Sequence, residues 1–174
     1  MLFAWSEPAT TRLLEGMWIS LPAFIVLAVI FLIEFIVRPP DFVIGDPKNP
    51  YLLRWWIIPR NRWLNVYLHQ ILRSDDDRAL HDHPWMSLSI ILAGAYTEVT
   101  PRGRRRMSAG SICLRKAAQA HRLEVEGKGP TWSLFITGPV EREWGFHCPK
   151  GWVHWRKFAA PGDKGQVGKG CEQD

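Results

Sequence analysis

Residues 80–94 read LHDHPWMSLSIILAG and carry the most informative pattern of the sequence, because a His-x-His pair leads into a strand-like alternation. If the backbone is extended here, His81 and His83 project from the same face, since strand side chains alternate with a period of two. Asp82 then faces the opposite side. The pattern predicts two imidazoles that meet at one point. A solvated histidine pair has the same spacing, so the surroundings of the motif decide between the two.

The sequence on both sides of this stretch predicts further strands. Short runs of aromatic and branched residues alternate with Gly, Pro or charged turns, and no long amphipathic helix is predicted between residues 51 and 160. Many short strands at close spacing are typical of an all-β sandwich or barrel. The predicted strands are residues 51–58, 63–72, 85–93, 95–99, 111–115, 119–125, 131–137, 142–147 and 152–158.

The spacing of two segments resembles the motifs of the cupin superfamily. From His83, three residues lead to Ser87 and six more to Gly94, as in the family's first motif of His-x-His, three or four residues, Glu, six residues and Gly. Gly110 is followed at the family's second spacing by His121. The resemblance implies a cupin double-stranded β-helix, also called a jelly-roll barrel, over residues 51–160. It also implies that His81, His83 and His121 bind a metal ion.

Departures from the two motifs limit what the resemblance implies. Ser87 stands where the family carries a metal-binding Glu, and Val125 stands where it carries Asn. A four-ligand site therefore does not follow, and the arrangement is similar to the three-histidine site of thiol dioxygenases. The segments around His81 and around residues 144–152 also resemble a group of uncharacterised bacterial cupin-domain proteins, which names no reaction. A cupin that has lost its metal is the alternative.

Three neutral imidazoles without a carboxylate suit Fe(II), which we expect here, and also Zn(II) or Ni(II). The site would keep the full charge of the ion and would favour anionic, chelating ligands. The expected function is a metal-dependent enzyme of the oxygenase type that acts on a small anionic molecule. The alternatives are a non-catalytic, membrane-tethered cupin that binds a small ligand, and a cupin-type isomerase. Candidate pocket or supporting residues are Trp85, Ser87, Tyr96, Glu98 and His69, whereas His147 and His154 are interpreted as structural.

The N-terminal region contains an almost unbroken apolar run at residues 17–37, with Glu34 as its one charge. A bilayer core requires about 20 apolar residues in a helix. The run therefore predicts a transmembrane helix over residues 17–38 after a tail at residues 1–16. More basic residues follow the run than precede it, which predicts a single-pass membrane protein with a cytoplasmic barrel. Residues 39–50 are interpreted as a linker and residues 161–174 as a flexible C-terminal tail.

Composition restricts the partners and the chemistry of the cysteines. Three cysteines without CxxC spacing argue against a disulfide framework and favour reduced thiols. Arg102 and residues 104–106 form a basic cluster, interpreted as a solvated loop or as a contact to anionic lipid headgroups. No nucleic-acid-binding module accompanies it, so nucleic acid is not an expected partner. The cupin resemblance also implies that the chain can form a homodimer.

Overall fold

The structure is a computed structural model that describes residues 20–75, 79–125, 127, 129–159 and 168–172. The chain divides into two units, Met1–Pro39 and Pro40–Asp174. The first unit contains one described helix, α1 (Leu21–Val37). It begins after Ser20, has Pro22 in its first turn where proline is tolerated, and ends at Arg38, which Pro39 and Pro40 follow.

The predicted transmembrane helix and the predicted single-pass membrane localisation, with a cytoplasmic barrel, are corrected here. Within the described ranges, no helix combines the length and the apolar character needed to cross a bilayer. Helix α1 has 17 residues, which at a rise of about 1.5 Å per residue is shorter than the roughly 30 Å hydrocarbon core. The extended Arg38 and the two prolines behind it end the helix. Residues 17–19 of the predicted span and the tail at 1–16 lie outside the described residues.

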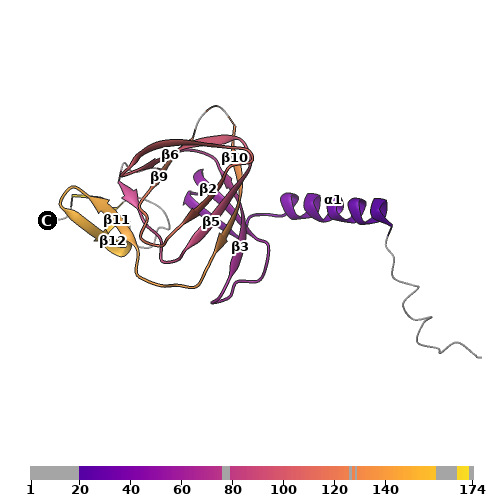
Figure 1. Cartoon of the computed structure of the whole chain (residues 1–174), viewed down its shortest axis with the longest axis horizontal. Coiled ribbons are helices and arrows are strands. Elements are labelled where there is room, and N and C mark those ends of the chain that lie inside the picture. Colours follow the sequence, from indigo (N-terminus) through magenta and orange to yellow (C-terminus); the bar gives the residue numbers. More distant parts are fainter. Residues whose placement is uncertain (1–19, 76–78, 126, 128, 160–167, 173–174) are drawn as a thin grey trace, which may run out of the picture. The chain divides into compact units, whose positions relative to one another are not determined.

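The second unit is mostly β, and one six-stranded antiparallel sheet forms its larger layer (Figure 1). Neighbouring strands follow the order β1-β2-β3-β10-β5-β8. Because β10 pairs between β3 and β5, segments far apart in the sequence form one surface. The bounds are β1 (Phe42–Asp46), β2 (Asn49–Trp56), β3 (Asn65–Ile71), β5 (Ser87–Ala93), β8 (Ile112–Arg115) and β10 (Thr131–Thr137).

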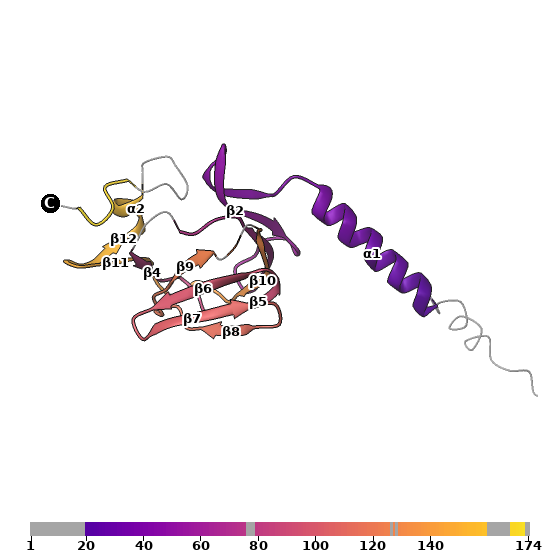
Figure 2. The ribbon, with the colours of Figure 1, turned by 90° about the horizontal axis from the view of Figure 1, so that it is seen from above.

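Two three-stranded sheets supply the remaining strands, in the orders β7-β6-β9 and β12-β11-β4. An isolated antiparallel bridge between His81 and His121 connects them, because β4 contains His81 and β9 follows directly after His121. Figure 2 shows β6 and β9 beside the larger sheet. The bounds are β4 (Leu80–His81), β6 (Ala95–Thr100), β7 (Gly103–Ser108), β9 (Arg122–Val125), β11 (Gly145–Cys148) and β12 (Gly151–His154).

Three segments differ from the sequence-based assignment. Strand β1 lies in the predicted linker, because Asp46 and Asn49 close a hairpin turn and Gly45 adopts a positive φ of 94°. Arg102 lies in a turn, but residues 104–106 of the basic cluster belong to strand β7, which pairs with β6 along its whole length at the sheet edge. Residues 155–158 form the short helix α2 (Trp155–Phe158), capped by His154, and do not continue a strand.

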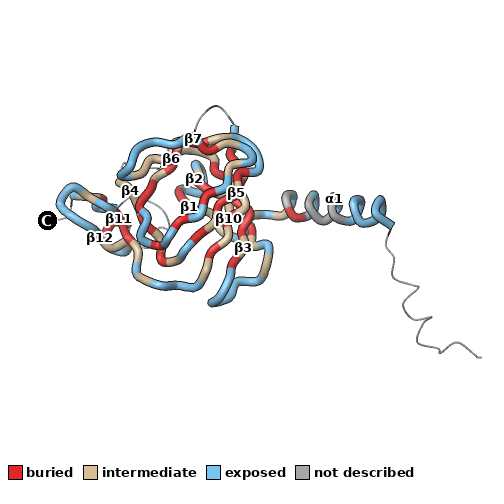
Figure 3. Tube along the Cα trace, viewed as in Figure 1, coloured by how far each residue is buried: buried red, intermediate tan, exposed pale blue. Residues whose placement is uncertain are grey.

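The apolar core lies inside the barrel at one end of the strands. Its buried residues come from both layers, as the alternation of buried and exposed positions along the strands shows in Figure 3. Strand residues two apart share a face, so each strand contributes only one or two side chains to this cluster. The cluster is Leu52, Ile71, Ile91, Tyr96, Met107, Cys113 and Leu123.

A smaller packed region surrounds β11 and α2. The rings of Phe146 and Phe158 stack with their centroids 3.6 Å apart. A disulfide joins Cys148 to Cys171 and ties the described residues 168–172 to β11. The expectation of reduced thiols is therefore wrong for two of the three cysteines. This pairing could not be predicted, because the two cysteines are 23 positions apart and carry no recognisable spacing. Cys113 is free and buried.

Candidate metal centre

The bridge between β4 and β9 places two of the predicted histidines side by side. His81 and His121 each donate a backbone N–H to the carbonyl oxygen of the other, at 2.8 and 2.9 Å. Residues opposite each other in an antiparallel pair project from the same face of the sheet. His83 is two positions beyond His81, so it continues on that face. The fold thus brings a local pair and a distant third imidazole together.

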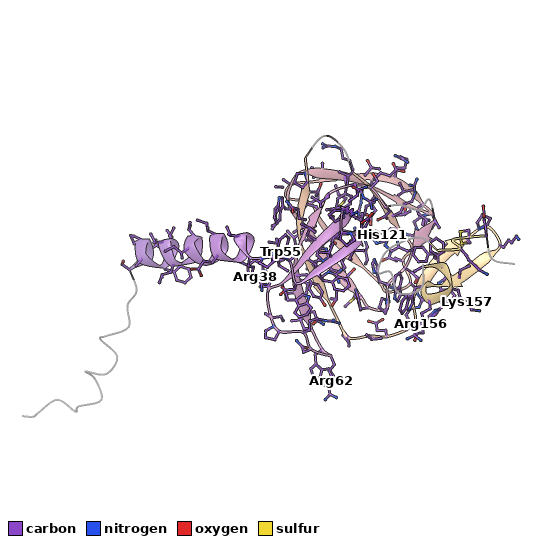
Figure 4. The ribbon with its side chains drawn as sticks, turned by 180° about the vertical axis from the view of Figure 1, so that it is seen from behind. Arg38, Trp55, Arg62, His121, Arg156 and Lys157 are labelled. Atoms are coloured by element: carbon purple, nitrogen blue, oxygen red, sulfur yellow. A yellow bond between two sulfur atoms is a disulfide. The ribbon has the colours of Figure 1, made fainter. Side chains whose placement is uncertain are left out.

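One ring nitrogen from each of His81, His83 and His121 lies within 4.8 Å of the others. The Nε2 atoms of His83 and His121 are 2.8 Å apart. Figure 4 shows His121 within the strands of the second unit. Metal–nitrogen distances of about 2.0–2.1 Å are typical of histidine ligands to Zn(II), and ligand nitrogens around one ion are therefore close neighbours. The donor set and its convergence fit a divalent ion.

A buried carboxylate orients the third histidine. Glu98 is 2 % exposed, and its Oε1 accepts a hydrogen bond from His121 Nδ1 at 3.0 Å. When Nδ1 carries the proton, Nε2 presents its lone pair to the other two imidazoles. Carboxylates that accept from the remote nitrogen of a metal-binding imidazole fix its tautomer and raise its basicity. Glu98 thus holds His121 in the form that can bind a metal.

Two guanidinium groups keep Glu98 ionised. Arg115 Nε donates to Oε1, and Arg105 Nη2 donates to Oε2 at 2.8 Å. Burial by itself raises the pKa of the Glu98 carboxyl, but the hydrogen bonds from His121 and Arg115 outweigh it and hold the pKa well below the usual range. The carboxylate is therefore charged at all pH values at which the protein is expected to work.

Burial also keeps the imidazoles neutral. Burial, followed by the neighbouring His121 and His81 rings, holds the pKa of His83 well below its usual value. Burial lowers the pKa of His121 to about 4, although its hydrogen bond to Glu98 acts in the opposite direction. Neutral imidazole is the form that binds metal ions, so neither ring has to lose a proton at pH 7.

Asp82 anchors the strand that carries the histidine pair. Its side chain faces away from the cluster and is 1 % exposed. It accepts hydrogen bonds from Gly145 N at 2.9 Å, His147 Nε2 at 3.0 Å and Trp152 Nε1 at 3.1 Å, and Arg142 Nη1 lies 2.8 Å from Oδ2. These contacts hold β4 against β11 and β12. Asp82 therefore fixes the backbone between the two histidines.

The other residues named from the sequence lie at different distances from the cluster. The Trp85 ring stacks on His83 with centroids 6.3 Å apart. Ser87 is buried on β5 opposite Arg115. His69 stacks on Phe135, whose ring lies 6.2 Å from that of His83. Tyr96 is buried in the apolar cluster, and its side chain also contacts the Arg115 guanidinium, which donates to Glu98.

Sequence reasoning did not single out Arg115, Asp75 or Asp82 as supporting residues. Asp75 Oδ2 accepts from Leu123 N at 2.8 Å and lies 3.8 Å from His81 Nδ1. Only Asp82 could have been recognised from the sequence. It lies between two candidate ligands in a strand, so its side chain must face away from them, toward the next sheet. Arg115 could not be recognised in the same way, since it contacts Glu98, 17 positions away, from a strand of a different sheet.

The fold and the histidine cluster together define an antiparallel β-barrel with a candidate metal centre. No family model matches the chain, and no curated protein matches it. Among solved structures, it is similar to a candidate mannose-6-phosphate isomerase from Ralstonia eutropha JMP134, with 17% identity, 57% of this chain and 93% of that chain covered, and a TM-score of 0.48.

Two further solved structures are similar to the chain. A conserved protein with a double-stranded β-helix domain from Klebsiella pneumoniae has 18% identity, coverage of 66% and 92%, and a TM-score of 0.47. A cupin superfamily protein from Desulfitobacterium hafniense DCB-2 has 16% identity, coverage of 52% and 78%, and a TM-score of 0.43. One of these neighbours is described as a cupin superfamily protein and another as a protein with a double-stranded β-helix domain, and the mostly-β fold of the chain agrees with the cupin resemblance of its sequence motifs. Likenesses at this level carry no argument about chemistry.

Proposed function

We propose that His81, His83 and His121 hold one divalent metal ion and that the protein uses it to act on a small anionic molecule. The observation that carries this proposal is the convergence of three ring nitrogens, one from each histidine, within 4.8 Å. A chance cluster of buried histidines would not need a buried carboxylate aimed at the remote nitrogen of one of them. Glu98 supplies that carboxylate.

The residues around the cluster favour an anionic substrate. No carboxylate belongs to the converging donor set found among the described residues, so the charge of a bound ion would not be neutralised by its protein ligands. When bound, Fe(II), the ion we expect, supplies Lewis acidity and redox chemistry with dioxygen; Zn(II) or Ni(II) supplies Lewis acidity. The chain's own residues keep the imidazoles neutral and fixed. We therefore propose an enzyme of the oxygenase type.

The proposed metal binding is tested on the full-length chain. The protein is stripped with EDTA and loaded anaerobically with Fe(II), and in parallel with Zn(II) or Ni(II), and bound metal is measured by elemental analysis. We expect one ion per chain for the wild type and loss of stoichiometric binding for His83→Ala and His121→Ala. His154→Ala is the matched control, because this histidine contacts Glu143 and α2 far from the cluster in the chain. Equal metal content in all variants would overturn the proposal.

The proposed oxygenase activity is tested on the same Fe(II)-loaded chain. Oxygen uptake is followed with small thiols, diketones and carboxylates, and we expect uptake with at least one class that His121→Ala abolishes. Stoichiometric metal without turnover of any class would instead assign the protein as a non-catalytic cupin that binds a ligand.

A further inference from the structure

Three buried polar atoms beside the histidine cluster have no hydrogen-bond partner in the part of the chain that the structure describes. They are Arg115 Nη2, Ser87 Oγ and Trp85 Nε1. Arg115 is 4 % exposed and Ser87 is 2 % exposed. Buried polar groups are nearly always hydrogen-bonded, because a lost partner costs free energy. Three unsatisfied atoms around one site therefore require an explanation.

Each of the three atoms belongs to a residue linked directly to the cluster or to its supporting network. Ser87 and Arg115 are cross-strand partners in the β5–β8 pair and both are buried, so their side chains are neighbours on the inner face. Arg115 also donates to Glu98, which holds His121. Trp85 stacks on the ring of His83. The unsatisfied atoms thus belong to residues that contact His83, contact the carboxylate that holds His121, or pair with Arg115 across β5 and β8.

The two engaged nitrogens of Arg115 leave one side of its guanidinium for a ligand. Nε donates to Glu98 and Nη1 donates to Ser89 Oγ at 2.8 Å. Both partners fix the plane of the group. Nη2 has no hydrogen-bond partner among the described residues, although the Tyr96 side chain also contacts the Arg115 guanidinium. A pre-positioned guanidinium N–H is a donor well suited to a carboxylate, and charge-assisted hydrogen bonds are roughly twice as strong as neutral ones.

Charge inside the barrel also favours an anion. A second guanidinium, that of Arg54, donates to His69 Nε2 at 2.8 Å and lies 4.7 Å from the centre of the Tyr67 ring. Arg54 thus donates to an imidazole and not to a carboxylate, whereas the Glu98 carboxylate is contacted by two guanidinium groups, those of Arg105 and Arg115. Among these described contacts the guanidinium groups outnumber the carboxylate, and this surplus of positive charge favours an anion.

We propose that Arg115, Ser87 and Trp85 form a subsite for the carboxylate of the substrate, beside the three histidines. This inference rests on the proposed function, and it narrows the substrate from an anion to a small carboxylic acid that also bears a metal-binding group. The three donors match the acceptor capacity of one carboxylate, whose two oxygens accept about four hydrogen bonds. The subsite also accounts for Ser87, which occupies a position where a metal-binding carboxylate would compete with the substrate for Arg115.

The subsite is tested on the full-length chain after EDTA treatment, so that bound metal plays no part. The indole ¹H–¹⁵N signals are titrated with acetate and, as a neutral isostere, with acetamide. We expect acetate to bind about tenfold more tightly than acetamide, since hydrogen bonds to charged groups contribute about 1.5–3 kcal/mol. The signal of Trp85, assigned by its loss in Trp85→Phe, should shift with acetate and not with acetamide.

Two variants remove a single unsatisfied donor without touching Glu98. Ser87→Ala and Trp85→Phe should each weaken acetate binding about tenfold while the loaded metal content stays the same. Trp63→Phe, an exposed tryptophan, is the matched control and should bind acetate as the wild type does. Equal binding of acetate and acetamide, or unchanged affinity in both variants, would overturn the subsite. A protein that selects acetate but never loads metal would instead overturn the metal proposal alone.

Discussion

The two ends of the barrel interior are built from the same strands but from opposite kinds of residues. Five strands change from an apolar to a polar inward side chain within two positions. The pairs are Leu52 and Arg54 on β2, Ile71 and His69 on β3, Ile91 and Ser89 on β5, Tyr96 and Glu98 on β6, and Cys113 and Arg115 on β8. The apolar end forms the core cluster, whereas the polar end carries the histidines and their supporting network.

This contrast separates stability from binding. Apolar burial stabilises a fold by about 25 cal/mol per Å², and a barrel selected for stability alone would continue its apolar layers to the other end. Buried ion pairs give little net stability, because desolvation offsets the attraction. An apolar end would therefore stabilise the fold more than the polar end does. Residues that lower stability in this way are the pattern expected of a ligand site.

The largest predicted effect comes from breaking the network at the polar end. Glu98→Ala should lower the free energy of unfolding by about 3–5 kcal/mol, because it leaves the buried Arg115 without its carboxylate. It should also weaken metal binding about 10–100-fold, since His121 loses its orienting acceptor. Denaturant unfolding and metal titration measure the two effects on one preparation.

Two comparison variants sharpen this prediction. Ile91→Ala, at the apolar end, should cost about 2–5 kcal/mol through the cavity it leaves but should not change metal affinity. The double variant Glu98→Leu with Arg115→Met should recover most of the lost stability and none of the metal binding. If Ile91→Ala weakened metal binding as much as Glu98→Ala, the two ends would not be separate in function.

The sequence predicted the mostly-β fold because strand alternation is a local property. It missed β7 because three consecutive arginines lack an apolar face, and an edge strand such as β7 can form without one. It missed β1 because the stretch with Pro47 and Pro50 was interpreted as a linker, although Pro47 lies in a hairpin turn and Pro50 pairs with Gly45 in the strands that this turn joins. The apolar run at 17–37 predicted a longer helix than the described α1, which ends at the extended Arg38 before two prolines.

The histidine cluster was accessible from sequence for a related reason. The period of two placed His81 and His83 on one face, and the motif spacing added His121. The network behind them was not accessible, because it depends on which strands pair. Glu98 on β6 and Arg115 on β8 belong to different sheets and meet only through their side chains, and Arg54 meets His69 only through the β2–β3 register. Neither pairing leaves a trace in local spacing.

A further prediction concerns His69 at the polar end and the pH dependence of the free energy of unfolding. Burial, and then the charge of Arg54, holds the pKa of His69 well below its usual value, while the unfolded chain titrates near 6.5. The unfolded state therefore binds more protons below that pH, and stability present above pH 6.5 is lost as the pH falls. The slope from this one group approaches about 1.4 kcal/mol per pH unit.

Replacement of His69 by Gln isolates that contribution. Gln keeps an acceptor for Arg54 Nε, so the variant should unfold with a shallower pH dependence between pH 6.5 and 5 than the wild type. The comparison is made by denaturant unfolding at each pH in EDTA. An identical slope in the two proteins would show that His69 is not held neutral by the barrel interior.

The smallest predicted effect has the opposite sign. Ser87→Ala removes a buried hydroxyl that has no hydrogen-bond partner among the described residues, so in the ligand-free protein it should raise the free energy of unfolding by about 1 kcal/mol. Ser89→Ala is the matched control: its hydroxyl accepts from Arg115 Nη1, and its removal should destabilise instead. A stabilised Ser87→Ala that binds acetate less tightly would mean that this position is kept polar for its ligand, because folding alone would favour alanine. A destabilised Ser87→Ala would show that Ser87 supports the fold. Ser87 would then belong with the structural residues and not with the ligand site.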